Sequence, residues 1–285
     1  MGVECRGAAR RRSGGLGVTL FRYPWLFMHY WRLSALVMAQ YPLNTVIWLV
    51  FATIYHLSSI GILWAMLQRF PVLGGWTFPE MFFLYALWNM AHGLYAITLA
   101  KVYWLSRHVR EGRFDIFQIR PVGALFQVIT TPEGISLQDP LIAIVLFVVA
   151  VGQLHVALTP TDFALLPAIV VGGALVKGGL LLAVYALSFW AVRMDAGRQL
   201  LETLEVQFVR FPLSIYPQAV QWFFSFVLPF AFVSFVPAQL ILRKDTVALL
   251  SPQLGYLTPA VGLAVFAAGY LLWRIGLRRY ESTGS

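Results

Sequence analysis

The sequence holds few side chains at the spacings that catalysis or metal binding needs. Its histidines fall in different segments, and no HxxxH or HExxH pattern places two of them on one face of a helix. The long apolar stretches contain neither a GxSxG sequence nor paired carboxylates for acid–base chemistry. We therefore expect no catalytic residue and no metal site. We interpret each histidine as packed or interfacial: His29, His56, His92, His108 and His155.

A nucleotide-binding loop is missing as well. The pattern GxxxxGK[ST] does not occur, and the nearest string, GGALVKGG at residues 172–179, lacks the required order and lies inside an apolar stretch. We expect this chain to bind no cofactor of its own. If ATP drives the protein, another chain must bind the ATP.

Lys177 is the one formal charge in the middle of an apolar run. An ammonium group there costs at least about 2.5 kcal/mol on insertion scales, so the side chain should face protein or water. Two interpretations are open. In the first, Lys177 lines a translocation path together with Gln153 and His155. In the second, it bonds to carbonyls or to Gln153 across a helix interface.

Glycines surround Lys177 at a helical repeat. Gly172 and Gly179 are seven residues apart and share one face of a helix, with Gly173 and Gly178 beside that face. Such a face lets a second helix approach closely. The pattern therefore favours a packed interface over a wide pore lining.

The composition indicates whether water or lipid surrounds the apolar stretches that contain Lys177 and these glycines. Of 285 residues, 59% are hydrophobic and 12% are charged, whereas a soluble domain carries about 25% charged residues. So little polar surface cannot cover a soluble globule, and most of the chain must face lipid. Each membrane span needs about 20 apolar residues, so the length allows six spans without a second folded domain. The single Cys5 can form no intramolecular disulfide.

The predicted fold class is an all-α polytopic membrane protein. We expect a basic cytoplasmic tail over residues 1–19 and a single transmembrane domain over residues 20–285. The domain begins with an interfacial amphipathic helix over residues 24–40, whose aromatic side chains alternatively serve only to anchor it in lipid. The six expected spans lie near residues 44–67, 79–101, 139–159, 165–191, 218–236 and 257–276.

The fifth apolar stretch differs from the others in length and proline content. It runs over the 32 residues from Phe211 to Leu242 and contains four prolines. A helix of that length would measure about 48 Å, well beyond a membrane core of about 30 Å. We expect a lead-in helix, then a span kinked at Pro229, then a partly re-entrant external segment.

The basic residues predict that both termini lie in the cytoplasm. With this orientation, 17 of the 21 Lys and Arg residues fall in cytoplasmic pieces, as the positive-inside rule requires. The outer loops keep only Arg69, Arg243 and Lys244. The net charge of +9 therefore indicates membrane topology and anionic lipid headgroups, and we expect no nucleic-acid partner.

Two predicted internal loops carry candidates for partner contact. Between Lys101 and Asp139, charged side chains alternate with large apolar ones, a helix can end at Gly112, and Pro121 can begin a short helix. This loop suits either docking into a groove on a soluble partner or a solvated loop held by its own salt bridges. In the second loop, Arg193 to Pro217, apolar residues recur at helical spacing, which is compatible with docking or with lying on the membrane.

Several short motifs occur in a definite order relative to the spans. They are Gly-x-x-Asp-x-x-x-x-Arg-Pro from Gly112 to Pro121, Gly75-Trp76 before the second span, and Tyr216-Pro217 followed by VLPFAFVSFVPA at residues 227–238. From about Leu20 to Arg279 the sequence resembles the ABC-2 family of six-helix permeases from bacterial ATP-binding cassette exporters. The Arg-rich N-terminal extension departs from the usual short start of that family, so its role stays open.

The resemblance implies a half-size permease of the bacterial cytoplasmic (inner) membrane. It implies pairing with a second permease, identical or related, and with two ATP-binding subunits on the cytoplasmic side that hold ATP and Mg. It also implies that the first internal loop carries a coupling helix that transmits nucleotide-driven closure. On this chain the coupling residues would be Arg107, Arg110, Glu111, Gly112, Phe114, Asp115, Phe117, Arg120 and Pro121.

Three classes of function compete for this sequence. A permease subunit of an exporter would carry a small amphiphilic molecule, drug or lipid and would not itself be an enzyme. A membrane-embedded lipid-processing enzyme would need a polar catalytic cluster, which the apolar spans lack. A secondary transporter would prefer inverted halves and several intramembrane carboxylates, and the predicted spans hold none. The sequence therefore favours the permease, and an ATPase that purifies with it would separate these classes.

Overall fold

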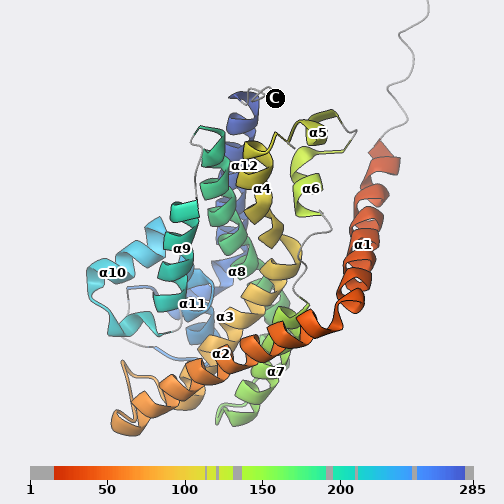
Figure 1. Cartoon of the computed structure of the whole chain (residues 1–285). Coiled ribbons are helices and arrows are strands. Elements are labelled where there is room, and N and C mark those ends of the chain that lie inside the picture. The colour runs from red at the N-terminus through yellow and green to blue at the C-terminus, as the bar shows by residue number, and fades with distance from the viewer. Residues whose placement is uncertain are drawn as a thin grey trace, which may run out of the picture.

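Figure 1 shows a computed structural model of the chain, which describes residues 16–112, 114–119, 122–130, 137–190, 195–208, 211–245 and 249–279. This described part is all-helical. The longer helices are α1 (Leu16–Gln40), α2 (Pro42–Arg69), α3 (Phe78–Thr98), α7 (Gln138–Gln153), α8 (Pro160–Ala186), α9 (Asp195–Phe208) and α12 (Thr258–Arg279). The shorter ones are α4 (Leu105–Arg110), α5 (Phe114–Ile119), α6 (Ala124–Ile129), α10 (Gln218–Trp222) and α11 (Phe235–Ile241). The first 15 residues of the expected basic tail lie outside the described residues.

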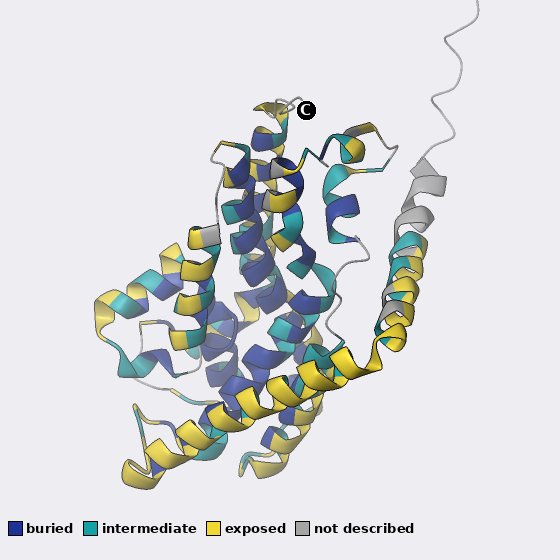
Figure 2. Cartoon of the chain, in the orientation of Figure 1, coloured by how far each residue is buried: buried dark blue, intermediate teal, exposed yellow. Residues whose placement is uncertain are grey.

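Helix α3 lies at the centre of the bundle because its sequence is apolar on every face. Its side chains from Met81 to Asn89 are all buried, and so is Trp76 just before the helix. A helix covered on all sides has no surface left for lipid. In Figure 2 the residues coloured as exposed instead follow α2 almost from end to end. The surface that meets the membrane or a partner is therefore carried by other helices, α2 foremost.

The close approach predicted from the glycines around Lys177 is confirmed, and the partner helix is α12. A Cβ atom on Gly172 would lie 2.7 Å from the carbonyl oxygen of Thr258, and one on Gly179 would lie 2.7 Å from Cα of Phe266. On α12, Gly262 and Gly269 face these two glycines in return. Helices α8 and α12 therefore touch backbone to backbone along this seam.

Helix α7 is shorter than the span expected over residues 139–159. It packs antiparallel to α3, with Gly93 against Pro140 and the Phe83 and Phe147 rings 5.8 Å apart, and it ends at Gln153. The next helix, α8, begins at Pro160 rather than near residue 165. Proline suits the first turn of a helix because its missing N–H would have no partner there. The residues between the two helices therefore form a connection.

The second predicted internal loop is not a surface loop in the structure. Its helix α9 runs antiparallel to α8, with Gly197 against Val184 and Glu205 beside Lys177, two turns farther along α8. The chain then continues to the opposite end of the bundle, where Ser214 donates a hydrogen bond of 2.9 Å to the carbonyl oxygen of Gly74. One face of α9, with Leu201 and Glu205, therefore packs on the bundle, whereas Leu200 is exposed.

The expected span over residues 218–236 is replaced by a broken helix pair. The segments Gln218–Val227 and Phe230–Ile241 meet at an angle of 81°. The break lies where the sequence predicts it, at Pro229, because a proline lacks the N–H that would continue a helix and forces the preceding residue into an extended conformation. The pair either breaks a crossing or enters and leaves the membrane on one side.

By length and composition, three helical stretches among the described residues can cross a membrane: Pro42–Arg69, Pro160–Phe189 and Pro252–Arg279. The broken pair would raise the number to four, and α7 is apolar but shorter. The expected count of six spans with both termini inside therefore stays a prediction.

The N-terminal helix α1 starts at Leu16, earlier than the interfacial helix expected over residues 24–40. It ends at Gln40, and α2 begins at Pro42 after one non-helical residue. Figure 1 shows α1 standing apart from the bundle for most of its length. Among its described residues, Trp31 contacts the bundle through a hydrogen bond of 3.3 Å from its indole N–H to the carbonyl oxygen of Ile97.

Candidate functional site

The first internal loop forms three short helices at the end of the bundle that also holds the C-terminus (Figure 1). Helix α4 ends at Arg110, and Gly112 follows with φ of 67°, a left-handed conformation that glycine adopts without steric cost. Helices α5 and α6 come next. Arg120 and Pro121 lie outside the described residues, as does the side chain of Arg110.

Phe114, one of the predicted coupling residues, is buried inside this chain. Its ring packs at centroid distances of 5.5 Å from Phe189 and 5.8 Å from Trp273, and Trp273 belongs to the C-terminal helix α12. Phe117 is half-buried and meets the imidazole of His108 edge-on at 5.2 Å. Phe114 therefore anchors α5 to the bundle and has no surface to offer a partner.

The exposed apolar residues of α5 are Ile116 and Ile119. The side chain of Ile116 is 47% exposed and that of Ile119 is 83% exposed. Phe114 and Phe117 are three residues apart and point inward, so Ile116 and Ile119, also three residues apart, occupy the other side of the helix. Ile116 and Ile119 are not among the predicted coupling residues, although they belong to the apolar residues of the same segment. The sequence signal for a second apolar face was the three-residue spacing within two pairs, Phe114 with Phe117 and Ile116 with Ile119.

The charged residues of this loop are held close to the bundle. Arg107 donates to Glu111 at 2.7 Å, and its guanidinium lies 5.4 Å from the ring centroid of Trp104. Asp115 is half-exposed in the first turn of α5. Charged side chains therefore precede the exposed isoleucines along the chain, on α4 and in the first turn of α5.

Lys177 lies in the interior of the bundle and forms an ion pair that sequence reasoning missed. Its ammonium is 2.9 Å from the carboxylate of Glu205 on α9, and it donates to Nδ1 of His92 on α3 at 2.6 Å. The indole N–H of Trp88 donates to the same carboxylate at 2.9 Å. Lys177 is 4% exposed and Glu205 is 2% exposed. The three helices α3, α8 and α9 therefore meet at one buried polar cluster, which we call the Lys177 cluster.

Gln153 and His155 do not belong to the Lys177 cluster. Both are exposed and lie at the far end of α7, beyond Phe147, which packs on Phe83. Lys177 instead bonds to His92, two and a half turns away from Phe83 along α3. The structure thus separates the three residues that the sequence analysis grouped as a translocation path.

A cavity of about 590 Å³ adjoins the Lys177 cluster. Its walls come from α2, α3, the first turn of α7 and Val206 of α9. Trp88 and His92 line it, and the polar atoms of both side chains are bonded to the ion pair. Lys177 therefore lies behind the cavity wall, and the ion pair fixes two of the rings that form this wall.

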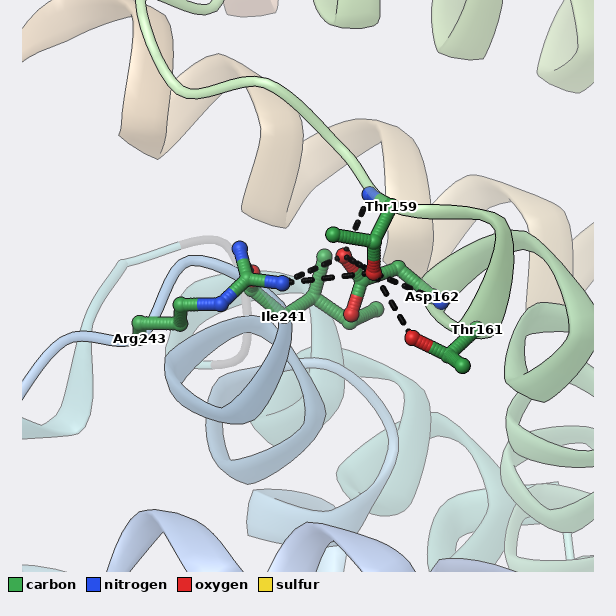
Figure 3. Close-up of polar contacts among 5 residues, drawn as sticks. All are labelled: Thr159, Thr161, Asp162, Ile241 and Arg243. Carbon is green, nitrogen blue, oxygen red and sulfur yellow. Dashed lines mark hydrogen bonds and ion pairs between the residues drawn. The ribbon is translucent and has the colours of Figure 1, made fainter.

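At the other end of the bundle, Arg243 and Lys244 connect the broken helix pair to two long helices. Arg243 donates to Asp162 at 2.8 Å and to the hydroxyl of Thr159 at 3.3 Å, as Figure 3 shows. Lys244 pairs with Glu80. Asp162 and Glu80 each sit in a capping box, with Thr159 on α8 and with Thr77 on α3.

We call these two ion pairs the Arg243–Lys244 clamp. Arg243 has φ of 51°, a left-handed conformation that costs a non-glycine residue roughly 1–2 kcal/mol. The side chain of Arg243 binds α8 and that of Lys244 binds α3, so the clamp connects α11 to the first turns of both helices. The clamp also neutralises two of the three basic residues that the sequence analysis left in the outer loops.

A family model described as ABC-2 family transporter protein matches residues 45–284. The matched range includes nearly all of α2 and every later element through α12. No curated protein and no solved structure matches the chain.

Proposed function

Because this chain belongs to the ABC-2 family and is one of its membrane permeases, we propose that it is the permease subunit of an ATP-driven exporter. In this proposal it resides in a bacterial cytoplasmic membrane and pairs with a second permease, identical or related. Two separate ATPase subunits bind ATP and Mg, since no phosphate-binding loop occurs in this sequence. The cargo is a small amphiphilic molecule, drug or lipid.

We propose a topology of six crossings with both termini in the cytoplasm, formed by α2, α3, α7, α8, α9 and α12. Helix α9 takes the place of the fifth span because it runs antiparallel to α8 from Val184 past Lys177, and the chain then reaches Gly74. The broken pair becomes a re-entrant segment at the outer end. Arg210 then lies outside and Arg198 lies within the α9 crossing, which leaves 15 of the 21 basic residues inside (17 less these two), so the positive-inside bias persists.

The observation that supports the ATPase as partner is the surface of α5. Ile116 and Ile119 are exposed on a helix whose other side is fixed by Phe114, and this helix lies at the same end as the C-terminus. In the proposed topology that end is cytoplasmic, where no lipid covers the isoleucines. A short helix with one side fixed and exposed apolar residues on the other suits docking into a groove.

The test is capture of an ATP-binding cassette ATPase by the tagged full-length permease. We expect Ile119→Asp to weaken capture by roughly tenfold or more, because it places a charge at the centre of the contact. Val72→Asp is the matched control, since Val72 is also an exposed apolar residue but lies in the loop at the opposite end. Equal capture by both variants would remove α5 as the docking element, and failure of the parent protein to capture any ATPase would refute the ATP-driven exporter.

A further inference from the structure

The cavity beside the Lys177 cluster has the size and the lining of a ligand site. Its volume of about 590 Å³ lies within the range of roughly 300–1,000 Å³ that small-molecule pockets occupy. From the shape and charge of its walls, we propose that it binds a lipophilic cation, an organic cation whose charge is surrounded by apolar groups. This assignment rests on the proposed function and names the class of its cargo.

The apolar part of the cavity is aromatic. Trp48, Phe51 and Tyr55 follow one another at intervals of three and four residues and therefore lie on one face of α2, and Trp88 faces them from α3. The faces of aromatic rings carry negative electrostatic potential, so they attract a cation as well as apolar groups. An anion of the same shape would be repelled by the same faces.

The polar part of the cavity contains one carboxylate among the described residues. Among the described residues that line it, the only formal charge is the carboxylate of Asp139 in the first turn of α7. The other polar groups are amides and imidazoles, such as Asn89 and His56, whose Nδ1 is hydrogen-bonded to the hydroxyl of Tyr85 at 2.7 Å. No lysine or arginine faces the cavity from these lining residues.

Lys177, which lies behind the cavity wall, is engaged by other side chains and not by the cavity. It is paired with Glu205 at 2.9 Å, bonded to His92, and lies 4.9 Å from the ring centroid of Tyr95. Glu205 also accepts the indole N–H of Trp88, which fixes that ring in the cavity wall. The ion pair therefore hides the lysine charge and at the same time orients one of the rings that would contact the cation.

The proposal is tested with two ions of one shape and opposite charge, tetraphenylphosphonium and tetraphenylborate. Binding of each radiolabelled ion to the purified full-length permease in lipid nanodiscs is measured, and binding to empty nanodiscs is subtracted. We expect saturable binding of the cation and none of the anion. Because no ATPase is present, this result is independent of ATPase capture, which tests the exporter itself.

Two variants locate the bound cation. Trp48→Leu removes a ring but keeps an apolar side chain, and Asp139→Asn removes the carboxylate charge; each should weaken cation binding by roughly tenfold. Trp64→Leu is the matched control, because Trp64 is exposed on the same helix (55%, against 58% for Trp48) but lies outside the cavity. Saturable binding of both ions, or parent affinity in either cavity variant, would overturn the assignment.

Discussion

At the scale of single residues, the ion pair between Lys177 and Glu205 is the feature with the largest energetic consequence. A lysine inside an apolar helix needs a partner, and the structure supplies a carboxylate, an imidazole and two aromatic rings. Removal of one member of such a pair leaves the other charge buried without compensation. The pair therefore makes the position of α9 depend on α8.

We predict that Lys177→Met destabilises the permease, because it leaves the carboxylate of Glu205 buried without its ion-pair partner. Breaking a buried pair on one side costs about 3–5 kcal/mol, whereas replacing both charges is nearly neutral. The double variant Lys177→Met/Glu205→Gln should therefore recover most of the stability, because the introduced amide oxygen can still accept the indole N–H of Trp88. Thermal unfolding of the purified protein in detergent measures both variants. A single variant as stable as the parent would show that the pair is not formed.

At the scale of elements, the glycine seam between α8 and α12 sets how closely these two helices pack. We predict that Gly179→Ala lowers stability by about 1–3 kcal/mol, because its methyl group would meet the backbone of Phe266. Gly61→Ala on α2 is the control, since a Cβ there meets nothing within 4 Å. That change should be neutral or stabilising by about 0.5–1 kcal/mol, since alanine favours a helix over glycine. Equal melting temperatures for both variants would contradict the close contact.

The Arg243–Lys244 clamp is the second prediction at this scale. Replacing both basic residues by glutamine should free α11 from α3 and α8, because the two carboxylates then cap their own helices only. In a Cys5→Ser background, a cysteine at Ala238, which is fully buried in α11, reports the change. Its reaction with a water-soluble maleimide should become faster when the clamp is removed. An unchanged rate would mean that packing, such as that of its Phe235 against Trp76, holds the helix without the clamp.

At the scale of the whole molecule, the course of α9 decides the topology. A single cysteine at Gln218 should react with an impermeant reagent added outside the cell if α9 crosses the membrane. If the fifth span instead runs over residues 218–236, the same cysteine lies inside and is protected. A cysteine at Ile119 is the control that should stay unlabelled from outside in intact cells. Labelling of Ile119 from outside would reverse the whole orientation.

Some of this protein could be predicted from sequence because the relevant physics is local. The shortage of charged residues identifies lipid as the solvent, and the family follows from motif order along the chain. Gly112 ends a helix, Pro229 breaks one, and Gly172 with Gly179 form a close-packed face. Each of these depends on the backbone properties of one residue or on a repeat within one helix.

Other features were decided only by tertiary structure, because they depend on which helix lies opposite. The charged face of α9 fits a partner protein, a membrane surface or a buried counter-charge equally well, and only its place beside Lys177 selects the last. On α5, two apolar pairs alternate around a short helix, and contact with Trp273 determines that Phe114 turns inward while Ile119 stays exposed. In α5 and α9 the spacing of apolar residues shows that the helix has two different faces. Which face is buried and which is exposed depends on the helices that pack against it.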